Sequence, residues 1–166
     1  MEFSLDKIDA FIIDFDGVMT NNHVYIDQEG KEIVKCSRAD GLAFDVLRKL
    51  NKPSFILSSE INPVVKMRAD KLKIQTIQGV KDKEIAVKEL ADKKNFNLKK
   101  LIYIGNDLND YQAMKICGYS ICPADSHSKI KEISSITLQS NGGKGVLREL
   151  LEDVFNLNII KILYEK

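Results

Sequence analysis

Residues 10–20 of this 166-residue chain read Ala-Phe-Ile-Ile-Asp-Phe-Asp-Gly-Val-Met-Thr, and this stretch decides the expected fold. The apolar run 10–13 ends in two carboxylates one residue apart, which is typical of a buried strand in a parallel sheet. Residues two apart on a strand share a face, so we expect Asp14 and Asp16 to point the same way. Adjacent carboxylates repel each other unless a cation lies between them. The pair therefore predicts a hard divalent cation with oxygen ligands, and Mg²⁺ above all.

Two residues that follow the carboxylates make the pattern more specific. Gly17 lets the backbone leave the strand in a tight turn, and Thr20 completes the pattern Asp-x-Asp-Gly-x-x-Thr. Two acids after a strand are by themselves also typical of an ordinary loop. The longer pattern is more informative than the pair, provided that the rest of the chain supplies matching parts.

Composition limits the classes of protein to which the chain can belong. Its length suits one domain, 1–166, with a full core. The 25 basic and 24 acidic residues give a net charge of +1, which favours neither nucleic acid nor a membrane surface as a partner. No apolar run approaches the roughly 20 residues of a membrane helix, and residues 1–6 are too acidic for a signal peptide. Three cysteines without Cys-x-x-Cys spacing indicate reduced thiols in a cytoplasmic protein.

Strand-like and helix-like segments alternate along the chain. We expect strands at 10–13, 54–57, 75–78, 101–104, 119–122 and 135–138, and helices at 40–50, 63–72, 80–94, 126–133 and 146–157, with one more that ends at 116. Asp40 is expected to cap the first helix, and Ile85 to face the core from the third. This alternation predicts an α/β fold, a three-layer Rossmann-like parallel sheet with helices on both faces. Two β-prone runs around Gly30 predict a small β-hairpin insertion at about 22–36.

Polar residues follow the expected strands at Asp14, Ser58 and Asn106. Ligands of parallel sheets bind beyond the carboxyl ends of the strands. The pattern Asp-x-Asp-Gly-x-x-Thr resembles the first motif of the haloacid dehalogenase superfamily, which implies phosphoryl transfer. Phosphoryl transfer needs a nucleophile, a proton donor and groups that neutralise charge. We expect Asp14 to be the nucleophile that forms an aspartyl-phosphate, and Asp16 to protonate the leaving oxygen and later to activate water. The Ser58 hydroxyl can donate to a phosphate oxygen, although a serine there is also typical of an ordinary loop.

Taken in order, these clusters resemble the motifs of the haloacid dehalogenase (HAD) superfamily, whose members are mostly Mg²⁺-dependent phosphatases. The resemblance covers nearly the whole chain. It implies that Asp14 and the backbone carbonyl of Asp16 hold the metal ion and that Ser58 is the second motif. It also implies that Lys83, at the start of a helix, is the third motif and faces the phosphate. A lysine in that place can equally be a solvated surface residue.

The fourth cluster departs from the superfamily pattern. Residues 105–110 read Gly-Asn-Asp-Leu-Asn-Asp, where HAD proteins usually read Gly-Asp-x-x-x-Asp. The amide oxygen of Asn106 is still a hard ligand. One negative charge is lost, so Mg²⁺ affinity should fall unless Asp107 or Asp110 compensates. The departure opens the possibility of a weakly active, structural domain.

The short chain, the small hairpin and the ending Gly142–Glu149 resemble one branch of the superfamily. This capless branch hydrolyses phosphates of 3-deoxy-2-keto sugar acids. It includes the phosphatases of 3-deoxy-D-manno-octulosonate (KDO) 8-phosphate and of KDN 9-phosphate. It also includes the phosphatase-like C-terminal domains of N-acylneuraminate cytidylyltransferases, which act in sialic acid metabolism. The resemblance implies a homotetramer in which the hairpins pack together and a neighbour covers each active site. An isolated hairpin is marginal in water, so a partner surface is expected on physical grounds as well.

Three charged residues after the second motif bear on the substrate. Octulosonate enzymes resemble this chain but carry arginine just past that motif, whereas nine-carbon enzymes carry glutamate. This chain has Glu60, followed by Arg68 and Lys71 on a helix. We expect Arg68 and Lys71 near the substrate carboxylate or phosphate, with Glu60 orienting one of them. The alternative is an exposed helix face held by salt bridges.

Three functions remain open from the sequence. The favoured one is a Mg²⁺-dependent phosphatase of a keto-deoxy sugar acid phosphate, with KDN 9-phosphate or a related nonulosonate preferred to KDO 8-phosphate. The second is a weakly active oligomerisation module related to acylneuraminate cytidylyltransferase. The third is another HAD chemistry, such as a phosphomutase, against which the lack of a large cap argues.

Overall fold

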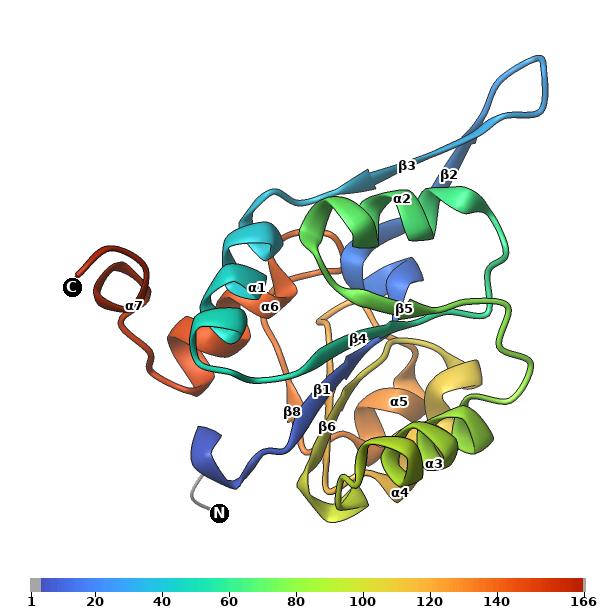
Figure 1. Ribbon diagram of the computed structural model, residues 1–166. Helices are drawn as coiled ribbons and strands as arrows, with labels where there is room; N and C mark the ends of the chain where they lie inside the picture. Colours follow the sequence, from blue (N-terminus) through green and yellow to red (C-terminus); the bar gives the residue numbers. More distant parts are fainter. Residues whose placement is uncertain (1–3, 166) are drawn as a thin grey trace.

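A six-stranded parallel sheet forms the middle layer of the structure, a computed structural model that describes residues 4–165 (Figure 1). In spatial order the strands are β5 (Gln75–Ile77), β4 (Ser54–Leu57), β1 (Ala10–Ile13), β6 (Leu101–Ile104), β7 (Tyr119–Cys122) and β8 (Ile136–Thr137). Every pair of neighbours in this sheet runs parallel. The predicted α/β fold is therefore confirmed. Residues 1–3 and 166 of the predicted domain lie outside the described residues.

Helices cover both faces of the sheet. One face carries α1 (Ala39–Lys49), α2 (Pro63–Leu72) and α6 (Val146–Glu149), and the other carries α3 (Lys83–Lys94), α4 (Tyr111–Ile116) and α5 (Ser128–Ile133) (Figure 1). The central strand β1 contributes side chains to the core on both faces of the sheet. Phe11 and Ile13 pack into one core cluster, and Ala10 and Ile12 pack into the other. All four residues are fully buried. Burial on both faces explains the unbroken apolar run in the sequence.

The strand order sets the position of the polar clusters. Strand β1 lies between β4 and β6, with Ile13 opposite Ile56 on one side and Ile104 on the other. The carboxyl ends of these three strands are therefore neighbours. The residues that follow them, which include Asp14, Ser58 and Asn106, come to one edge of the sheet.

The hairpin insertion projects from this edge as a separate two-stranded sheet (Figure 1). It consists of β2 (Thr20–Ile26) and β3 (Glu32–Cys36), so it begins two residues earlier than predicted. Tyr25 pairs with Ile33 across the antiparallel ladder, and the two residues are 59% and 58% exposed. Val24 and Ile26 are exposed too. The hairpin thus presents apolar side chains to solvent.

Two details of the predicted helices are wrong. Asp40 does not cap α1, because its buried carboxylate accepts a hydrogen bond from the backbone N–H of Leu147 at 2.9 Å. The cap contact comes from Ser37, whose hydroxyl oxygen accepts from the N–H of Ala39. Ile85 is 53% exposed, because α3 is rotated so that Lys83 and Val87 face inward instead.

The C-terminal region also differs from the single helix predicted at 146–157. There α6 passes into a wider helical turn, Leu150–Val154, and a further helix, α7 (Ile159–Tyr164), follows. Helix α7 packs against α1, and Lys49 Nζ donates to the carbonyls of Ile162 and Leu163. The last carbonyls of a helix lack partners within the helix, so a lysine that reaches them satisfies the helix end.

All three cysteines are free, and Cys117 and Cys122 are buried. Within residues 4–165, every helix is too short or too polar to cross a membrane.

Candidate active site

Asp14 and Asp16 lie on a tight turn after β1 and not on the strand itself. The strand ends at Ile13, and Gly17 takes φ = +84° within the turn. The Thr20 hydroxyl oxygen accepts a hydrogen bond from the N–H of Gly17 at 3.1 Å and braces the turn. The strand-face argument was therefore wrong, although both carboxylates still line one cleft. A turn closed by Gly17 and Thr20 explains the spacing of the pattern.

The cleft lies at the carboxyl edge of the sheet and has a volume of about 320 Å³. Its walls come from the turn after β1, from the hairpin and from the loop after β6. The lining residues are Asp14, Asp16, Asn22, Asn106, Asp107, Leu108 and Asn109. The first and fourth sequence motifs are thus brought together here.

Lys83 joins the third motif to the first. Its Nζ lies 2.7 Å from Oδ1 of Asp14 and 2.7 Å from Oδ1 of Asp110, and all three side chains are buried. Lys83 is the first residue of α3, and Asp82 caps that helix by accepting from the N–H of Ile85. The helix start therefore aims a buried ammonium at the nucleophile candidate.

Burial and charge act in opposite directions on this cluster. Burial alone would lower the pKa of Lys83, but Asp14 and Asp110 outweigh it, so the pKa is raised. Burial, together with the nearby charge of Asp110, raises the pKa of Asp14 well above its ordinary value, and Lys83 only partly offsets this. A further cation beside Asp14 would act in the same direction as Lys83 and lower this pKa.

Asp16 is less buried than Asp14 and has a different electrostatic environment. Burial first, and then the negative charge of Glu60, raise the pKa of Asp16. An acid that donates a proton to a leaving group needs a pKa raised in this direction. The two carboxyl groups thus have the different surroundings that different roles require.

Asn106 provides the test of whether a metal ion fits. Its side-chain Oδ1 is buried and has no hydrogen-bond partner among the described residues. Its amide lies against Gly17, where an added Cβ would come within 1.9 Å of Nδ2. Within residues 4–165 no three His, Cys, Asp or Glu side chains gather as metal ligands, so the candidate set is two acidic residues and one amide. An orphaned amide oxygen beside two acids fits a hard divalent cation.

The other residues of the motifs are placed as follows. Ser58 is buried at the end of β4, and its hydroxyl oxygen accepts from the N–H of Glu60 at 3.1 Å, so its own proton remains to donate. Asp107 is exposed, and its carboxylate accepts from the N–H of Leu108 at 2.7 Å, capping the turn. Asp110 is held by Lys83, so we assign it to orienting the lysine and not to the metal ion.

Glu60, Arg68 and Lys71 do not form the predicted arrangement. The Glu60 carboxylate accepts from the N–H groups of Ile61 and Asn62, at 2.7 and 2.9 Å, and so it stabilises its own loop. Arg68 donates to the carbonyl of Ser37 at 2.9 Å. Arg68 and Lys71 line a separate groove of about 490 Å³ between α1 and α2. The expectation that Glu60 orients one of these cations is not met, and their contact with substrate stays a prediction.

Tyr103 is a site residue that the sequence analysis missed. It lies on β6, is fully buried, and donates from its hydroxyl to Oδ1 of Asp110 at 2.8 Å. In the sequence it stands within the apolar run Leu101–Ile104, which hides it among core residues. The available signal was a hydroxyl group within an otherwise apolar strand, directly before the polar cluster at 105–110.

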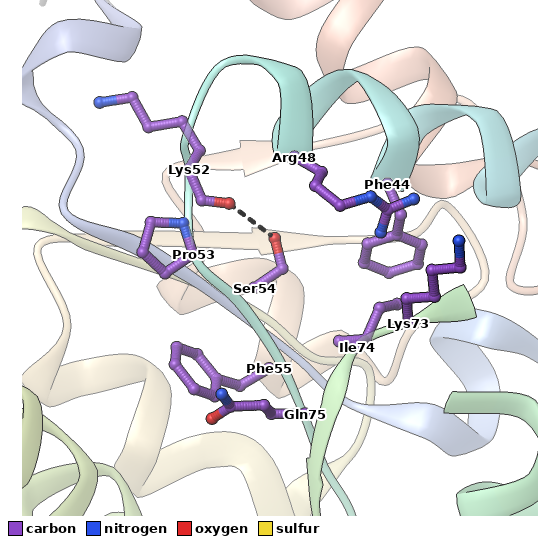
Figure 2. Close-up of a pocket in the computed structure, with 9 residues that line it drawn as sticks. All are labelled: Phe44, Arg48, Lys52, Pro53, Ser54, Phe55, Lys73, Ile74 and Gln75. Atoms are coloured by element: carbon purple, nitrogen blue, oxygen red, sulfur yellow. Dashed lines mark hydrogen bonds between the residues drawn. The ribbon is translucent and has the colours of Figure 1, made fainter. Parts of the chain in front are cut away.

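Another hollow lies at the opposite edge of the sheet (Figure 2). Its volume is about 190 Å³, and it opens at Ser54 and Gln75, the first residues of β4 and β5. Figure 2 shows the Lys52 side chain directed away from it, and its Nζ donates to the carbonyl of Ile8 at 2.9 Å. This hollow contains none of the predicted site residues and lies at the amino ends of strands, where α/β sheets do not usually bind ligands.

Comparison with known proteins identifies the family of the chain. Residues 56–150 match the family model described as haloacid dehalogenase-like hydrolase. The 3-deoxy-D-manno-octulosonate 8-phosphate phosphatase of Haemophilus influenzae is 30% identical over 90% of this chain and 84% of its own length.

Two solved structures are similar over almost the whole chain. The corresponding phosphatase of Moraxella catarrhalis, in complex with magnesium, phosphate and KDO, is 29% identical, with a TM-score of 0.85 over 94% of this chain and 87% of its own. The cobalt-bound phosphatase of Haemophilus influenzae is 27% identical, with a TM-score of 0.85 over 98% of this chain and 95% of its own.

Proposed function

This chain belongs to the haloacid dehalogenase-like hydrolases and is a phosphoric monoester hydrolase, and we propose that it hydrolyses the phosphate of a 3-deoxy-2-keto sugar acid by way of an aspartyl-phosphate. The observation that carries the proposal is the contact of 2.7 Å between Lys83 and Asp14 at the cleft that Asn106 also lines. It unites the first, third and fourth motifs of a phosphoryl-transfer site.

The proposed reaction has two steps. Oδ1 of Asp14 accepts from Lys83 and from the N–H of Phe15, at 2.7 and 2.8 Å, so Oδ2 is the oxygen that attacks phosphorus. As the bond from phosphorus to the sugar oxygen breaks, Asp16 gives its proton to that oxygen. Asp16 then takes a proton from water, which attacks the aspartyl-phosphate and releases inorganic phosphate. The Asp14 carboxylate is thereby regenerated.

Two side chains hold the phosphate in this scheme. The Lys83 ammonium, already fixed by two carboxylates, neutralises charge on the phosphate oxygens. Ser58 donates its hydroxyl proton from the end of β4. Groups fixed before the substrate arrives stabilise a transition state with little reorganisation.

Mg²⁺ is the cofactor that we propose for this site. Asp14, the backbone carbonyl of Asp16 and the Oδ1 of Asn106 would hold it, and Asn106 is the residue whose buried oxygen lacks a partner among those described. When bound, the ion supplies the positive charge that keeps Asp14 ionised and draws in the phosphate.

KDO 8-phosphate is the first candidate substrate. The relatives that cover most of this chain carry that activity in their names. A nine-carbon substrate such as KDN 9-phosphate is the second candidate, because Glu60 stands just past the second motif and its charge acts on Asp16. Glu60→Arg tests the distinction, since it should favour the eight-carbon over the nine-carbon phosphate if Glu60 selects the longer chain.

The covalent step has a direct test that needs no natural substrate. Fluoroberyllate mimics a phosphoryl group on a carboxylate, so the native chain with Mg²⁺ should bind it at Asp14. Asp14→Asn should abolish that binding and leave the circular dichroism spectrum unchanged. Equal binding by both proteins would reject Asp14 as the nucleophile.

We also propose a homotetramer built on the hairpins. The exposed pair Tyr25 and Ile33 needs a partner surface, and a two-stranded hairpin is too small to be stable by itself. Light scattering should give a tetramer, and Tyr25→Glu with Ile33→Glu should reduce it to smaller species. Gln28→Glu, which adds charge at the turn without removing an apolar side chain, should leave it intact. A native monomer at micromolar concentration would contradict the proposal.

A further inference from the structure

The hydroxyl of Tyr103 reaches the catalytic cluster from inside the sheet. Tyr103 pairs with Ile12 across the β1–β6 ladder, and its ring packs in the core on the α3 side. Its hydroxyl oxygen lies 2.8 Å from Oδ1 of Asp110. The reaction as described uses neither this hydroxyl nor any other atom of Tyr103.

Asp110 is surrounded by donors. Oδ1 accepts from Tyr103 and from Lys83, at 2.8 and 2.7 Å. Oδ2 accepts from the N–H of Asn106 at 2.9 Å and from that of Asp107 at 3.3 Å. Oδ1 of Asp110 therefore accepts hydrogen bonds from both Tyr103 and Lys83, and Lys83 also contacts Asp14.

We propose that Tyr103 is a positioning residue for the hydrolysis, which sets how the Lys83 ammonium is shared between Asp110 and the nucleophile Asp14. The inference rests on the proposed function, in which Asp14 attacks phosphorus. It goes beyond that function because it assigns a role to a core residue that touches neither the substrate nor the cleft.

The physical argument concerns competition for one cation. A carboxylate that loses a donor keeps more charge on its oxygen, so it attracts a neighbouring ammonium more strongly. Without the tyrosine hydroxyl, Asp110 should draw Lys83 away from Asp14. Burial and the charges of Asp110 and Asp14 raise the pKa of Tyr103 well above its ordinary value, so the hydroxyl keeps its proton and can donate at neutral pH.

Tyr103→Phe tests the inference because it removes only the hydroxyl. We expect kcat to fall roughly tenfold, as for the loss of one hydrogen bond to a charged group, with KM changed less than about twofold. Tyr119→Phe is the matched control. Tyr119 also lies on a strand of the sheet and packs against the other core cluster. Loss of its hydroxyl should therefore leave kcat within about twofold of the native value.

A double-mutant comparison separates positioning from a general loss of stability. In an Asp110→Asn background, Tyr103→Phe should have little further effect on kcat, because the two residues act through one interaction. Independent, multiplicative losses would overturn the inference. So would a folded Tyr103→Phe protein with native kcat.

A crystal structure of Tyr103→Phe gives a measurement that does not depend on turnover. The inference requires Lys83 Nζ to leave hydrogen-bond distance of Asp14 Oδ1 while its contact with Asp110 remains. A retained contact of 2.7 Å would contradict it. If the native protein itself released no phosphate, the proposed function would fail, and this structure would still decide whether Tyr103 controls the lysine.

Discussion

Lys83 Nζ lies 2.7 Å from Asp14 Oδ1, and both side chains are almost fully buried. This contact joins the start of α3 to the turn after β1. A buried cation between Asp14 and Asp110 stabilises charges that burial alone would disfavour. The contact therefore bears on folding as well as on the proposed chemistry, and the two effects can be measured separately.

Lys83→Met should destabilise the metal-free protein strongly. It leaves two buried carboxylates without their cation, which costs about 3–5 kcal/mol when one partner of a buried pair is removed. Urea unfolding without Mg²⁺ measures the loss. Adding Asp110→Asn should recover part of it, because one of the two uncompensated charges is then gone.

The matched control lies on the same helix. Lys88 pairs with Glu84 at 2.6 Å on the exposed face of α3, so Lys88→Met should cost less than about 1 kcal/mol. Similar losses in the free energy of unfolding for Lys83→Met and Lys88→Met would show that the buried contact stabilises the fold no more than an exposed ion pair does.

Asn106→Asp should bind Mg²⁺ more tightly than the native protein. The change restores a carboxylate at a buried oxygen that has no described partner, and it strengthens the attraction to a dication. Saturating Mg²⁺ should raise the melting temperature more in the variant, and turnover at low Mg²⁺ should rise or stay level. Asn109→Asp adds the same charge elsewhere on the cleft wall and should change Mg²⁺ affinity less. Identical titrations for native protein and Asn106→Asp would rule out Asn106 as a ligand.

Asp40→Asn should change how stability depends on pH. Burial raises the pKa of Asp40 from 3.8 to about 6. The native state therefore holds a proton that the unfolded state has lost between these values, and native stability falls as pH rises from about 4 to 6. The shift corresponds to about 3 kcal/mol in total. Asparagine does not ionise and keeps an acceptor for the N–H of Leu147, so its stability lacks this fall.

The measurement for Asp40→Asn is urea unfolding across this pH range. The free energy of unfolding of the variant, relative to that of the native protein, should increase between pH 4 and 7. Above pH 7 this difference should be constant. A difference that is the same at pH 4 and pH 7 would mean that folding does not raise the pKa of Asp40.

Much of the fold could be predicted from local sequence patterns. The apolar run at 10–13 is buried on both faces, so a buried strand of a parallel sheet could be predicted there. The motif spacing also pointed to Asp14 and Lys83, because HAD-like clusters occur in order along the chain. The hairpin was visible because its two β-prone runs flank a glycine turn.

Long-range contacts explain what the sequence prediction missed. Aspartate commonly caps helices, but the carboxylate of Asp40 accepts a hydrogen bond from the backbone N–H of Leu147, far along the chain. Ile85 fits a helical stripe, yet burial of Lys83 fixes the rotation of α3. Tyr103 is hidden in a strand, and only the approach of Asp110 gives its hydroxyl a role. The contact of Asp40 with Leu147 and the rotation of α3 have no local signature.

The most direct test of the account is phosphate release from a panel of sugar acid phosphates, with and without Mg²⁺. The panel should contain KDO 8-phosphate, KDN 9-phosphate and a simple sugar phosphate, and Asp14→Asn serves as the inactive control. We expect Mg²⁺-dependent release that is fastest with KDO 8-phosphate and absent in the control. Faster release from KDN 9-phosphate would select the second candidate substrate. No release by the native protein from either keto-deoxy sugar acid would contradict the central claim and leave an oligomerisation module as the better explanation.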